Sequence, residues 1–325
     1  MTEQGEVIEN PEIIEVNIDL KLSPCKNKIK LLSNGLISNG DDHATTALLI
    51  LNQHIDIGQL FIKIWHNSSL RVCADGAANR LYDFFEDDEE ERLKYKPDYI
   101  IGDLDSIKDD VFKYYQSLGV VIIKQTTQYS TDFTKCVNLI SIHYNSPSFK
   151  QFLQDHKLES NHGIELERGI HEFYNSMMNE IKSVTTIPSI NLVVINGIGG
   201  RFDQTIHSIT QLYNLKQKDP YFQMSFITNT DIIILISKNG TILEFDPNFR
   251  KQCIGNCGLL PIGEPTIIIE TIGLKWDVKN WDTSISTGKV SSNNRFVGGN
   301  KCYFHVEDDL VLNIEIFLDK VIEYI

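Results

Sequence analysis

The sequence predicts an α/β protein with a mostly parallel sheet flanked by helices, followed by a smaller all-β, sandwich-like domain. Three observations support this fold class. Short, continuous apolar runs recur through the first two-thirds of the chain, as in buried parallel strands. Helical periodicity lies between these runs, which is typical of strands connected by crossover helices. From about residue 237 helical periodicity fades, and short strand-like runs separated by turn residues replace it.

These patterns divide the chain into three regions. We expect residues 1–44 to form an irregular leader, residues 45–236 an α/β domain and residues 237–325 the all-β domain. Within the α/β domain, the polar stretch at about 144–188 lacks a clear strand and predicts an insertion with some helix. The apolar runs of this domain lie at 46–51, 71–76, 98–103, 119–124, 191–197 and 224–229.

The other elements follow from periodicity and from short β-like runs. Three sets of residues at helical spacing each predict one apolar helix face. They are Phe133, Cys136, Val137 and Ile140; Ile107, Val111, Tyr114 and Leu118; and Ile206, Ile209 and Tyr213. The strand-like runs of the last region are TILEF, PTIIIETIGL, KVSSNNRF, KCYFHVE and LVLNIEIFL. The acidic run at 86–91 is expected to be a solvated loop or helix end.

Composition and charge limit the function classes. The chain has 325 residues, enough for about two domains of about 150 residues each. A net charge of −14 disfavours a nucleic-acid partner, although a small anion can still bind through a local cation or metal. No signal peptide is visible, and no window approaches the roughly 20 apolar residues of a membrane helix. We therefore expect no membrane partner, a cytoplasmic location and reduced cysteines rather than disulfides or zinc.

Charged residues follow the predicted strands at the edge where open parallel sheets bind ligands. Asp75 comes directly after one strand, and Asp103 and Asp105 follow the next. Two carboxylates two residues apart can face one hard cation, and magnesium prefers such oxygen ligands. The simpler alternative is that Asp75 and Asp105 only cap the helices that follow them.

Two further strand ends carry charge. Asp132 and Lys135 lie one helical turn apart, on the same side of the predicted helix. The carboxylate could bind the metal or orient the substrate hydroxyl, and the ammonium could bind phosphate. The alternative is that the two residues form only an exposed salt bridge. Glycines at 197–200 precede Arg201 and Asp203 at a helix start, where backbone N–H groups and a guanidinium suit phosphate. A purely structural turn is the alternative there.

The convergence of these groups is more informative than any one of them. Four strand ends carry carboxylates together with an Arg and a Lys, which helix capping alone does not require. One magnesium ion holding a polyphosphate accounts for the set, because phosphoryl-transfer sites combine metal, cationic clamps and positioning. The sequence has no Walker motif, so it does not predict a P-loop enzyme.

At these residues the sequence resembles the thiamine pyrophosphokinase family, in particular its fungal branch. The resemblance covers residues 45–325, and its motifs occur in the family's order. They are ADGAANRLYD at 74–83, PDYIIGDLDSI at 97–107, TDFTKC at 131–136, GGRFDQ at 199–204, GLKWD at 273–277 and VSSNN at 290–294.

The resemblance implies a homodimer that transfers pyrophosphate from the co-substrate ATP to the thiamine hydroxyl, giving thiamine diphosphate and AMP. It implies an ATP-binding catalytic α/β domain and a thiamine-binding β domain. The catalytic, magnesium-binding cluster would be Asp75, Asp103, Asp105 and Asp132. Nucleotide or phosphate contacts would come from Gln128, Lys135, Arg201 and Asp203. The thiamine pocket would include Trp276, Ser292, Asn293 and Asn294.

The sequence departs from the family pattern at three places. Ala77 replaces the second of two glycines that often follow the first Asp. Tyr129 stands where a carboxylate is often found three residues before Asp132. Ser291-Ser292-Asn293-Asn294 replaces the Ser-Thr-Ser-Asn string of animal members, so a Ser-specific role there does not carry over.

Several alternatives stay open from the sequence. Asp132 or Asp75 would accept the alcohol proton, because a carboxylate saturated with metal is a poor base. Trp276 would stack on the cationic thiamine ring, or would be a buried aromatic of the β domain. The chain could instead be a non-catalytic thiamine or nucleotide sensor, or a magnesium-dependent phosphotransferase acting on another alcohol.

Overall fold

The computed structural model describes residues 5–18, 25, 27–31, 37–38, 45–86, 88–181, 187–238 and 240–324. The chain divides into two compact units. Unit 1 comprises Met1–Ala44, Asp56–Ile64 and Ile209–Ile325, and unit 2 comprises Thr45–Ile55 and Trp65–Ser208. Two of the four divisions fall within helices, namely α1 (Gly58–Asn67) and α8 (Phe202–Lys218).

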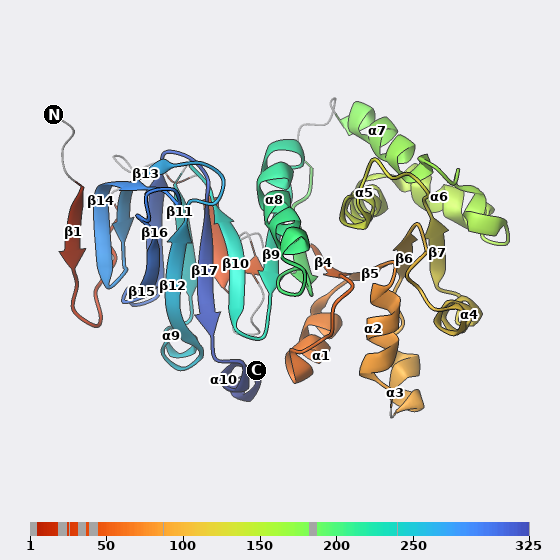
Figure 1. Ribbon diagram of the computed structural model, residues 1–325, viewed down its shortest axis with the longest axis horizontal. Helices are drawn as coiled ribbons and strands as arrows, with labels where there is room; N and C mark the ends of the chain where they lie inside the picture. Colours follow the sequence, from red (N-terminus) through yellow and green to blue (C-terminus); the bar gives the residue numbers. More distant parts are fainter. Residues whose placement is uncertain are drawn as a thin grey trace. The chain divides into compact units, whose positions relative to one another are not determined.

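Unit 2 is built on a parallel sheet (Figure 1). Its strands run in the order β8-β4-β5-β6-β7, and every neighbouring pair is parallel. They are β4 (Thr45–Ile50), β5 (Leu70–Ala74), β6 (Tyr99–Gly102), β7 (Val121–Lys124) and β8 (Ile190–Ile195). Because parallel strands share one carboxyl edge, the residues that follow them are brought to one side of the unit.

Helices cover both faces of this sheet. In Figure 1, α5, α6 and α7 lie on one face, and α2, α3 and α4 lie on the other. Their bounds are α2 (Ala77–Phe84), α3 (Glu89–Lys94), α4 (Asp109–Ser117), α5 (Asp132–Asn145), α6 (Pro147–Asp155) and α7 (Gly169–Ile181). Nine residues of α5 are buried, eight of them consecutive at 135–142, so this helix is covered on most sides and not only along one apolar stripe.

The predicted insertion at about 144–188 forms part of this helical cover in its described residues. It contains α6, the 3₁₀ turn η1 (Ser160–Gly163) and α7. The Phe149 ring of α6 packs 5.2 Å from the Phe173 ring of α7. The N–H of Ile170 donates to the Gln125 side chain just after β7, so the segment is tied to the edge of the sheet.

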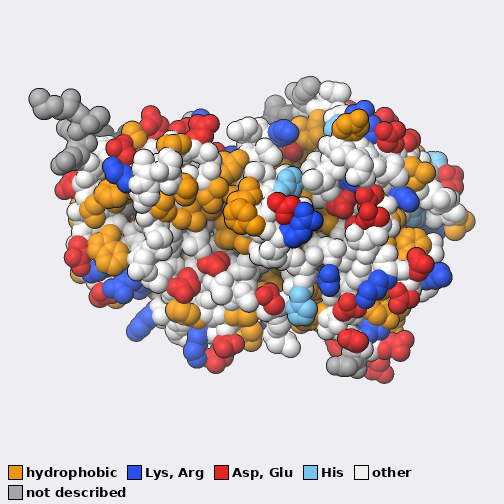
Figure 2. Space-filling model, viewed as in Figure 1, with side chains coloured by type: hydrophobic (Ala, Val, Ile, Leu, Met, Phe, Trp, Pro, Cys, Tyr) orange, Lys and Arg blue, Asp and Glu red, His pale blue; other side chains and the backbone are white. Residues whose placement is uncertain are grey.

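The acidic run forms a helix start. Asp88 caps α3 by accepting a hydrogen bond from the N–H of Glu91, and carboxylates in a first turn are favoured by the helix dipole. Buried Arg92 donates to the carbonyls of Phe85 and Glu86 and so fixes the preceding turn. In Figure 2 acidic side chains gather at the lower right, over α3.

Unit 1 contains two largely antiparallel sheets, which lie face to face in Figure 1. One has the order β15-β12-β17-β10-β9, and the other has the order β1-β14-β13-β16-β11-β2-β3. The first sheet consists of β9 (Phe222–Ile227), β10 (Asp231–Ile236), β12 (Ile254–Leu260), β15 (Ser291–Arg295) and β17 (Leu310–Ile316).

The second sheet draws its strands from both ends of the chain. They are β1 (Glu6–Glu9), β2 (Asn27–Leu31), β3 (Ile37–Ser38), β11 (Thr241–Phe245), β13 (Thr266–Ile272), β14 (Trp276–Thr283) and β16 (Lys301–Val306). Helices α9 (Pro247–Cys253) and α10 (Leu318–Tyr324) complete the unit. The predicted architecture, an α/β part followed by a β-sandwich-like part, is therefore the observed one.

The boundaries differ from the sequence prediction in two places. The expectation of an irregular leader at 1–44 is wrong for its described part, because β1 pairs with β14 and β2 pairs with β11. Residues 209–236 also belong to unit 1, since β10 pairs antiparallel with both β9 and β17. Five of the six residues of β9 are buried, which is the pattern that the strands of unit 2 also show.

Two further expectations can be compared with the described chain. All six cysteines are free thiols, and five of them are buried. No helix among the described residues combines the length and the hydropathy that crossing a bilayer requires.

Candidate active site

Asp75 lies at the carboxyl end of β5, where the chain turns into α2. Its backbone is in the left-handed region with φ of 42°, a conformation that Asp adopts more readily than most residues. The Asp75 N–H donates to the Ile101 carbonyl, and one carboxylate oxygen accepts from the Ser106 N–H at 3.1 Å. The other oxygen, Oδ1, is buried without a hydrogen-bond partner among the described protein groups.

Gly102 allows the neighbouring strand end to approach this carboxylate. A Cβ atom at Gly102 would lie 2.5 Å from the Asp75 Cβ and 3.3 Å from the Asp132 Cγ. The contact with the Asp75 Cβ is too short for any side chain at this position, so glycine lets β6 end beside the two Asp side chains. The glycine before the Asp-x-Asp sequence is therefore part of the site's geometry.

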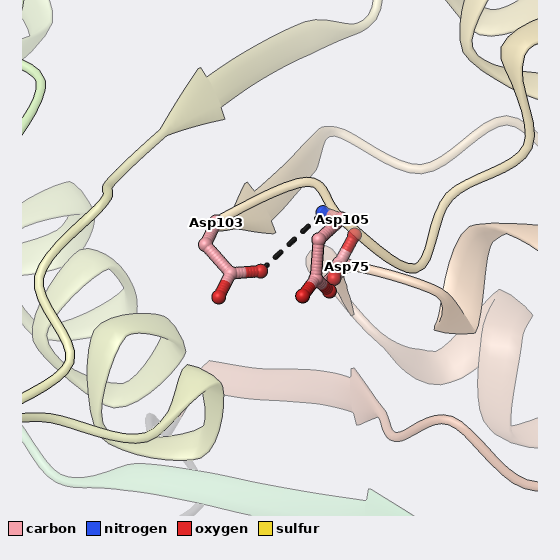
Figure 3. A group of neighbouring side chains, drawn as sticks. All are labelled: Asp75, Asp103 and Asp105. Carbon is pink, nitrogen blue, oxygen red and sulfur yellow. Dashed lines mark hydrogen bonds between the residues drawn. The ribbon is translucent and has the colours of Figure 1, made fainter.

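Asp103 and Asp105 stand on the turn that follows β6. Leu104 between them has φ of 62°, which is uncommon for a residue with a side chain. Asp103, Asp105 and Asp75 each offer one carboxylate oxygen, and these three atoms lie within 4.8 Å of one another. Figure 3 shows the three side chains converging, with the Asp105 N–H directed at Asp103 at 3.4 Å. We call these three residues the carboxylate cluster.

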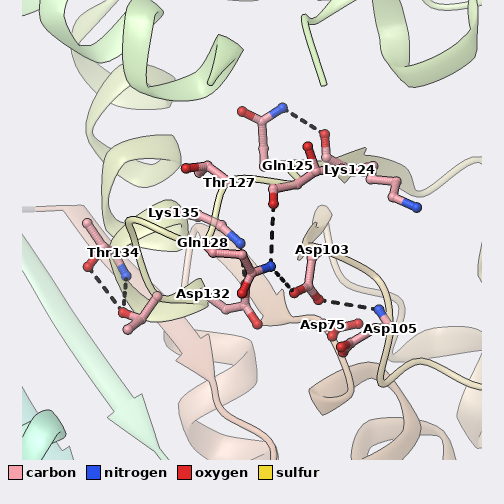
Figure 4. A network of polar contacts seen from close by, with 12 residues as sticks. Asp75, Asp103, Asp105, Lys124, Gln125, Thr127, Gln128, Asp132, Thr134 and Lys135 are labelled. Atoms are coloured by element: carbon pink, nitrogen blue, oxygen red, sulfur yellow. Dashed lines mark hydrogen bonds and ion pairs between the residues drawn. The ribbon is translucent and has the colours of Figure 1, made fainter. Parts of the chain in front are cut away.

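Asp132 and Lys135 border the carboxylate cluster from the first turn of α5 (Figure 4). The Lys135 ammonium is almost fully buried and lies 2.9 Å from Asp132 Oδ1. The exposed salt bridge considered as an alternative is therefore not observed. Gln128 donates to Asp103 Oδ2 at 3.1 Å, so the loop before α5 is also tied to the cluster.

Burial and like charge set the electrostatics of this site. Burial, with a contribution from Asp132, Asp103 and Asp105, raises the pKa of Asp75 to about 6. Burial also raises the pKa of Asp132, although Lys135 opposes the effect. At Asp103, burial acts upward, but hydrogen bonds from Gln128 and Asp105 and the charge of Lys135 hold its pKa below the ordinary value. The site therefore combines carboxyl groups of unequal basicity.

A cavity of about 530 Å³ opens beside the carboxylate cluster, within unit 2. Its walls include Asp103, Asp132, Lys135, Gln128 and Arg201, five of the residues that the sequence singles out. Asp203 does not line the cavity. Its carboxylate accepts from the Arg201 Nε at 3.1 Å, and both side chains are exposed.

The glycine turn before α8 is shaped by residues that the sequence argument missed. Gly199 and Gly200 have positive φ, and the Gln53 amide donates to the Gly199 carbonyl at 2.9 Å. Asn196, with φ of 62°, donates to the Gln53 carbonyl at 2.7 Å. The position of Gln53 just after the first apolar run was a usable signal, because it marks another strand end.

More polar residues line the cavity than the sequence argument named. The additional ones are Asn52, Gln53, Ser106, Ser130, Thr131, Asn196, Gln204, His207 and Ser208. Gln204 and Ser208 are four residues apart on α8, so one helix face supplies both. This helical spacing was visible in the sequence, but nothing in it indicated which face of α8 meets the cavity.

The residues of the carboxylate cluster fit a divalent cation. Three carboxylate oxygens close together supply the hard ligands that magnesium prefers, and Asp75 Oδ1 has no other partner to satisfy it. Unneutralised, this arrangement leaves a buried negative charge, which is costly. Asp132 borders the set but is paired with Lys135.

The predicted thiamine residues lie in unit 1. Trp276 and Asn294 line a mostly apolar cavity of about 150 Å³, together with Trp281, Ser291 and five apolar residues. Ser292 and Asn293 are exposed and do not line it. Trp276 is 38 % exposed, so it is not a core aromatic. Asn294 is buried, and its amide pairs with the N–H and the carbonyl of Trp276 at 3.1 and 2.8 Å.

Trp281 also lines this cavity, although it lies an odd number of residues, five, after Trp276. Residues five apart on a regular strand face opposite sides, but Asn280 has φ of 47° and interrupts the alternation. Sequence patterning therefore could not place Trp281 beside Trp276.

Comparisons with known proteins agree with this two-unit arrangement. Residues 61–224 match the family model for the catalytic domain of thiamin pyrophosphokinase, and residues 243–311 match that for its vitamin B1-binding domain. Fold and matches together define the class of the protein, a transferase with an α/β catalytic part and a β-rich ligand-binding part.

The chain belongs to the thiamin pyrophosphokinase family. It is 58 % identical to the thiamine pyrophosphokinase of Saccharomyces cerevisiae, over 98 % of this chain and 99 % of the relative. The yeast enzyme's crystal structure matches with a TM-score of 0.91 and 56 % identity, over 98 % of this chain and all of that one. The Candida albicans structure matches with a TM-score of 0.79 and 36 % identity, over 96 % and 99 % of the two chains.

Proposed function

We propose that this chain transfers the pyrophosphate group of ATP to the hydroxyl of thiamine, giving thiamine diphosphate and AMP. Membership of the family supports this activity, as does the carboxylate cluster at the carboxyl edge of a parallel sheet. The single observation that carries the proposal is the convergence of Asp75, Asp103 and Asp105 beside a polar cavity large enough for a nucleotide's phosphates.

Asp75, Asp103 and Asp105 would hold a magnesium ion, with Asp132 beside them. When bound, magnesium neutralises charge on phosphate oxygens and helps to orient them. The chain's own part is to bring the carboxylates together, which the tight turn at Leu104 and the missing side chain at Gly102 make feasible. A cation there would satisfy the buried Asp75 Oδ1.

The phosphates would be held by cationic and amide groups around the cavity. Lys135 supplies a point charge next to Asp132, and Arg201 supplies a planar guanidinium at the start of α8. Asp203 orients that guanidinium through its two hydrogen bonds rather than touching the nucleotide. Gln128 donates to Asp103 and also lines the cavity, so it would contact both a metal ligand and the bound nucleotide.

Asp75 or Asp132 would accept the proton of the thiamine alcohol as it attacks the β-phosphorus. Both carboxyl groups have a pKa raised by burial, which makes them more basic than an exposed aspartate. Asp132 keeps Lys135 at 2.9 Å, so a proton it gained would weaken an existing ion pair. Asp75 has an oxygen without such a partner, but a cation held by the carboxylate cluster would occupy that oxygen and lower its basicity, so each candidate carries its own cost.

Trp276 would stack on the cationic thiamine, with Ser292 and Asn293 of β15 offering exposed polar groups. Asn294 would act indirectly, because both ends of its amide are used on the Trp276 backbone. Unit 1 would thus be the thiamine-binding part and unit 2 the ATP-binding part. We further propose a cytoplasmic homodimer, which light scattering and cell fractionation test.

Product analysis tests the proposed reaction. Protein incubated with magnesium, ATP and thiamine should give thiamine diphosphate and AMP in equal amounts, measured by chromatography. ADP as the product would indicate simple kinase chemistry instead. Binding of thiamine without turnover would indicate a sensor.

The Asp103→Asn variant tests the metal site in the same assay. It keeps the size of the side chain but removes one charge from the carboxylate cluster. We expect a loss of about 100-fold or more in turnover, the scale at which transition-state electrostatics act. Turnover close to that of the wild type would remove Asp103 from the metal site.

A further inference from the structure

An N-terminal segment of unit 1 is built onto the turn that carries Trp276. Strand β1 pairs antiparallel with β14, in a register that places Glu9 opposite Trp276. The segment continues past β1, and Ile14 forms a bridge with Gly298. We call residues 6–14 the N-terminal strap. Its sequence mixes charged and apolar residues without a regular period and gives no sign of such a role.

Asn10 is the centre of the contact between the strap and the turn at 273–277. Its side-chain amide donates to the Leu274 carbonyl at 2.8 Å and to Asp277 Oδ2 at 2.6 Å. Its backbone N–H donates to the Lys275 carbonyl at 2.8 Å, and its own carbonyl accepts from the Lys275 ammonium at 2.6 Å. Asn10 therefore bonds to residues on both sides of Trp276.

Asp277 gives this turn its shape from within. Its buried carboxylate accepts hydrogen bonds from the N–H groups of Gly273 and Leu274, both at 3.0 Å, and from the Thr271 hydroxyl at 2.9 Å. The Asn10 amide is a further donor to the same carboxylate. A buried carboxylate is tolerated only when its acceptor sites are satisfied, so losing Asn10 removes one of the four donors that stabilise the charge of the residue next to Trp276.

Ion pairs reinforce the same contact. The largely buried Lys275 ammonium lies 3.3 Å from Glu9 and 3.7 Å from Glu12, and Glu12 also accepts from Arg295 at 2.7 Å. Exposed pairs of this kind contribute little singly, but here they join the strap to two separate segments.

The strap also contributes directly to the cavity beside Trp276. Val7 of β1 is one of its lining residues, with Trp276 and Trp281. The cavity of about 150 Å³ has room for one aromatic ring and is lined mainly by apolar side chains. Without β1, one wall of this cavity would be missing.

We propose that the N-terminal strap completes the thiamine-ring pocket, and that Asn10 is the positioning residue that holds Trp276 against the ring. This inference rests on the proposed function. It adds to that function a determinant of thiamine affinity that lies more than 260 residues before Trp276 in the chain. Asn10 acts through the turn and does not touch the reacting atoms.

Steady-state kinetics of a double-mutant cycle test the proposal. We expect Asn10→Ala to raise the KM for thiamine roughly tenfold, the factor that corresponds to about 1.4 kcal/mol. The KM for ATP, and kcat at saturating thiamine, should stay within about twofold of the wild type. Asn17→Ala is the matched control, because Asn17 is exposed in the same N-terminal segment and has no hydrogen bond to the turn at 273–277 among the described residues.

The cycle separates positioning from general destabilisation. In a Trp276→Ala background, Asn10→Ala should have no further effect on the KM for thiamine, because the residue it positions is gone. Asn10→Ser keeps a small donor near Asp277, and it should show the same selective effect at smaller size if Asn10→Ala does not fold at the assay temperature.

Two outcomes contradict the inference in distinguishable ways. The first is a wild type that converts thiamine while Asn10→Ala leaves the KM for thiamine unchanged. The same conclusion, that the strap does not act through Trp276, follows if Asn10→Ala raises this KM by the same factor in the wild type and in the Trp276→Ala background. A wild-type chain that forms no thiamine diphosphate would instead contradict the proposed function.

Discussion

At the scale of single residues, the site depends on a conflict between function and stability. The Asp75 side chain is 3 % exposed, faces two other carboxylates and leaves one oxygen without a partner. Such an arrangement destabilises the folded chain unless a cation neutralises it. Residues that break a local rule in this way are expected at functional sites.

We expect Asp75→Asn to stabilise the metal-free protein while abolishing most activity. The folded-state pKa of Asp75, about 6, lies above its ordinary value of 3.8. A group with a raised pKa favours folding when protonated, and this contribution is lost as the pH rises from about 4 to about 6. At pH 7.5 in chelator the variant should therefore be more stable, by on the order of 2 kcal/mol.

Thermal or urea unfolding at two pH values measures this effect. The stability difference between Asp75→Asn and the wild type should shrink towards zero near pH 3, which lies below the ordinary pKa of 3.8, so that Asp75 is mostly protonated in both the folded and the unfolded chain. Excess magnesium should stabilise the wild type more than the variant. A variant less stable than the wild type at pH 7.5 would show that the Asp75 charge is already compensated within the protein.

The sequence could predict most residues of the candidate site, but it could only partly predict how each of them acts. Carboxylates directly after apolar runs predicted Asp75, Asp103, Asp105 and Asp132, because strand ends meet at one edge of a parallel sheet. It could not show that Asn294 binds the Trp276 backbone, since that depends on a pairing 18 residues away. Nor could it show that Asp203 orients Arg201 instead of lining the cavity.

At the scale of elements, the start of α5 links fold and site. Thr131 caps the helix by accepting a hydrogen bond from the Thr134 N–H, and the helix then presents Asp132 and Lys135 to the cavity. The same hydroxyl lies 3.1 Å from the His207 Nε2 of α8. One capping residue therefore fixes the start of α5 and connects it with a second helix of the site.

We expect Thr131→Ala to lower the free energy of unfolding by about 1 kcal/mol, the usual contribution of an N-cap. Because the first turn of α5 carries Asp132 and Lys135, turnover should fall as well. Thr131→Ser keeps the capping hydroxyl and should retain both stability and activity. Urea unfolding and the product assay measure the two effects, and equal stability of the Ala and Ser variants would contradict the capping role.

Elements with continuous local signals could be predicted from the sequence, and elements that depend on distant partners could not. The apolar runs gave the five strands of unit 2, and helical periodicity gave α4, α5 and α8. Strands β1 and β2 are short and partly polar, and they are stabilised by β14 and β11, more than 200 residues away. Local patterning contains no information on such pairings.

At the scale of the whole molecule, unit 1 is discontinuous in the chain. Its sheets combine β1, β2 and β3 with strands after residue 208, and β10 lies between β9 and β17 in one of them. The region at 237–325, which the sequence predicts as a separate domain, therefore lacks neighbours for several of its strands.

We expect the isolated fragment 237–325 not to fold. It would lack β10, the partner of β17, and β2, the partner of β11, so two strand edges would be unpaired. Circular dichroism and one-dimensional NMR should show little dispersion or aggregation. A cooperative melt of the fragment would contradict this and would make the β region an independent domain.

The pairing of β1 with β14 also bears on how the chain is made. About 270 residues separate the two strands, so a ribosome adding 5–20 residues per second leaves β1 without its partner for on the order of ten seconds or more. During that time β1 and β2 are segments of only four and five residues, at least half of them polar or charged, which protects them from premature association. The polar character that hides these strands from prediction thus suits segments that must wait for the last part of the chain before they can fold.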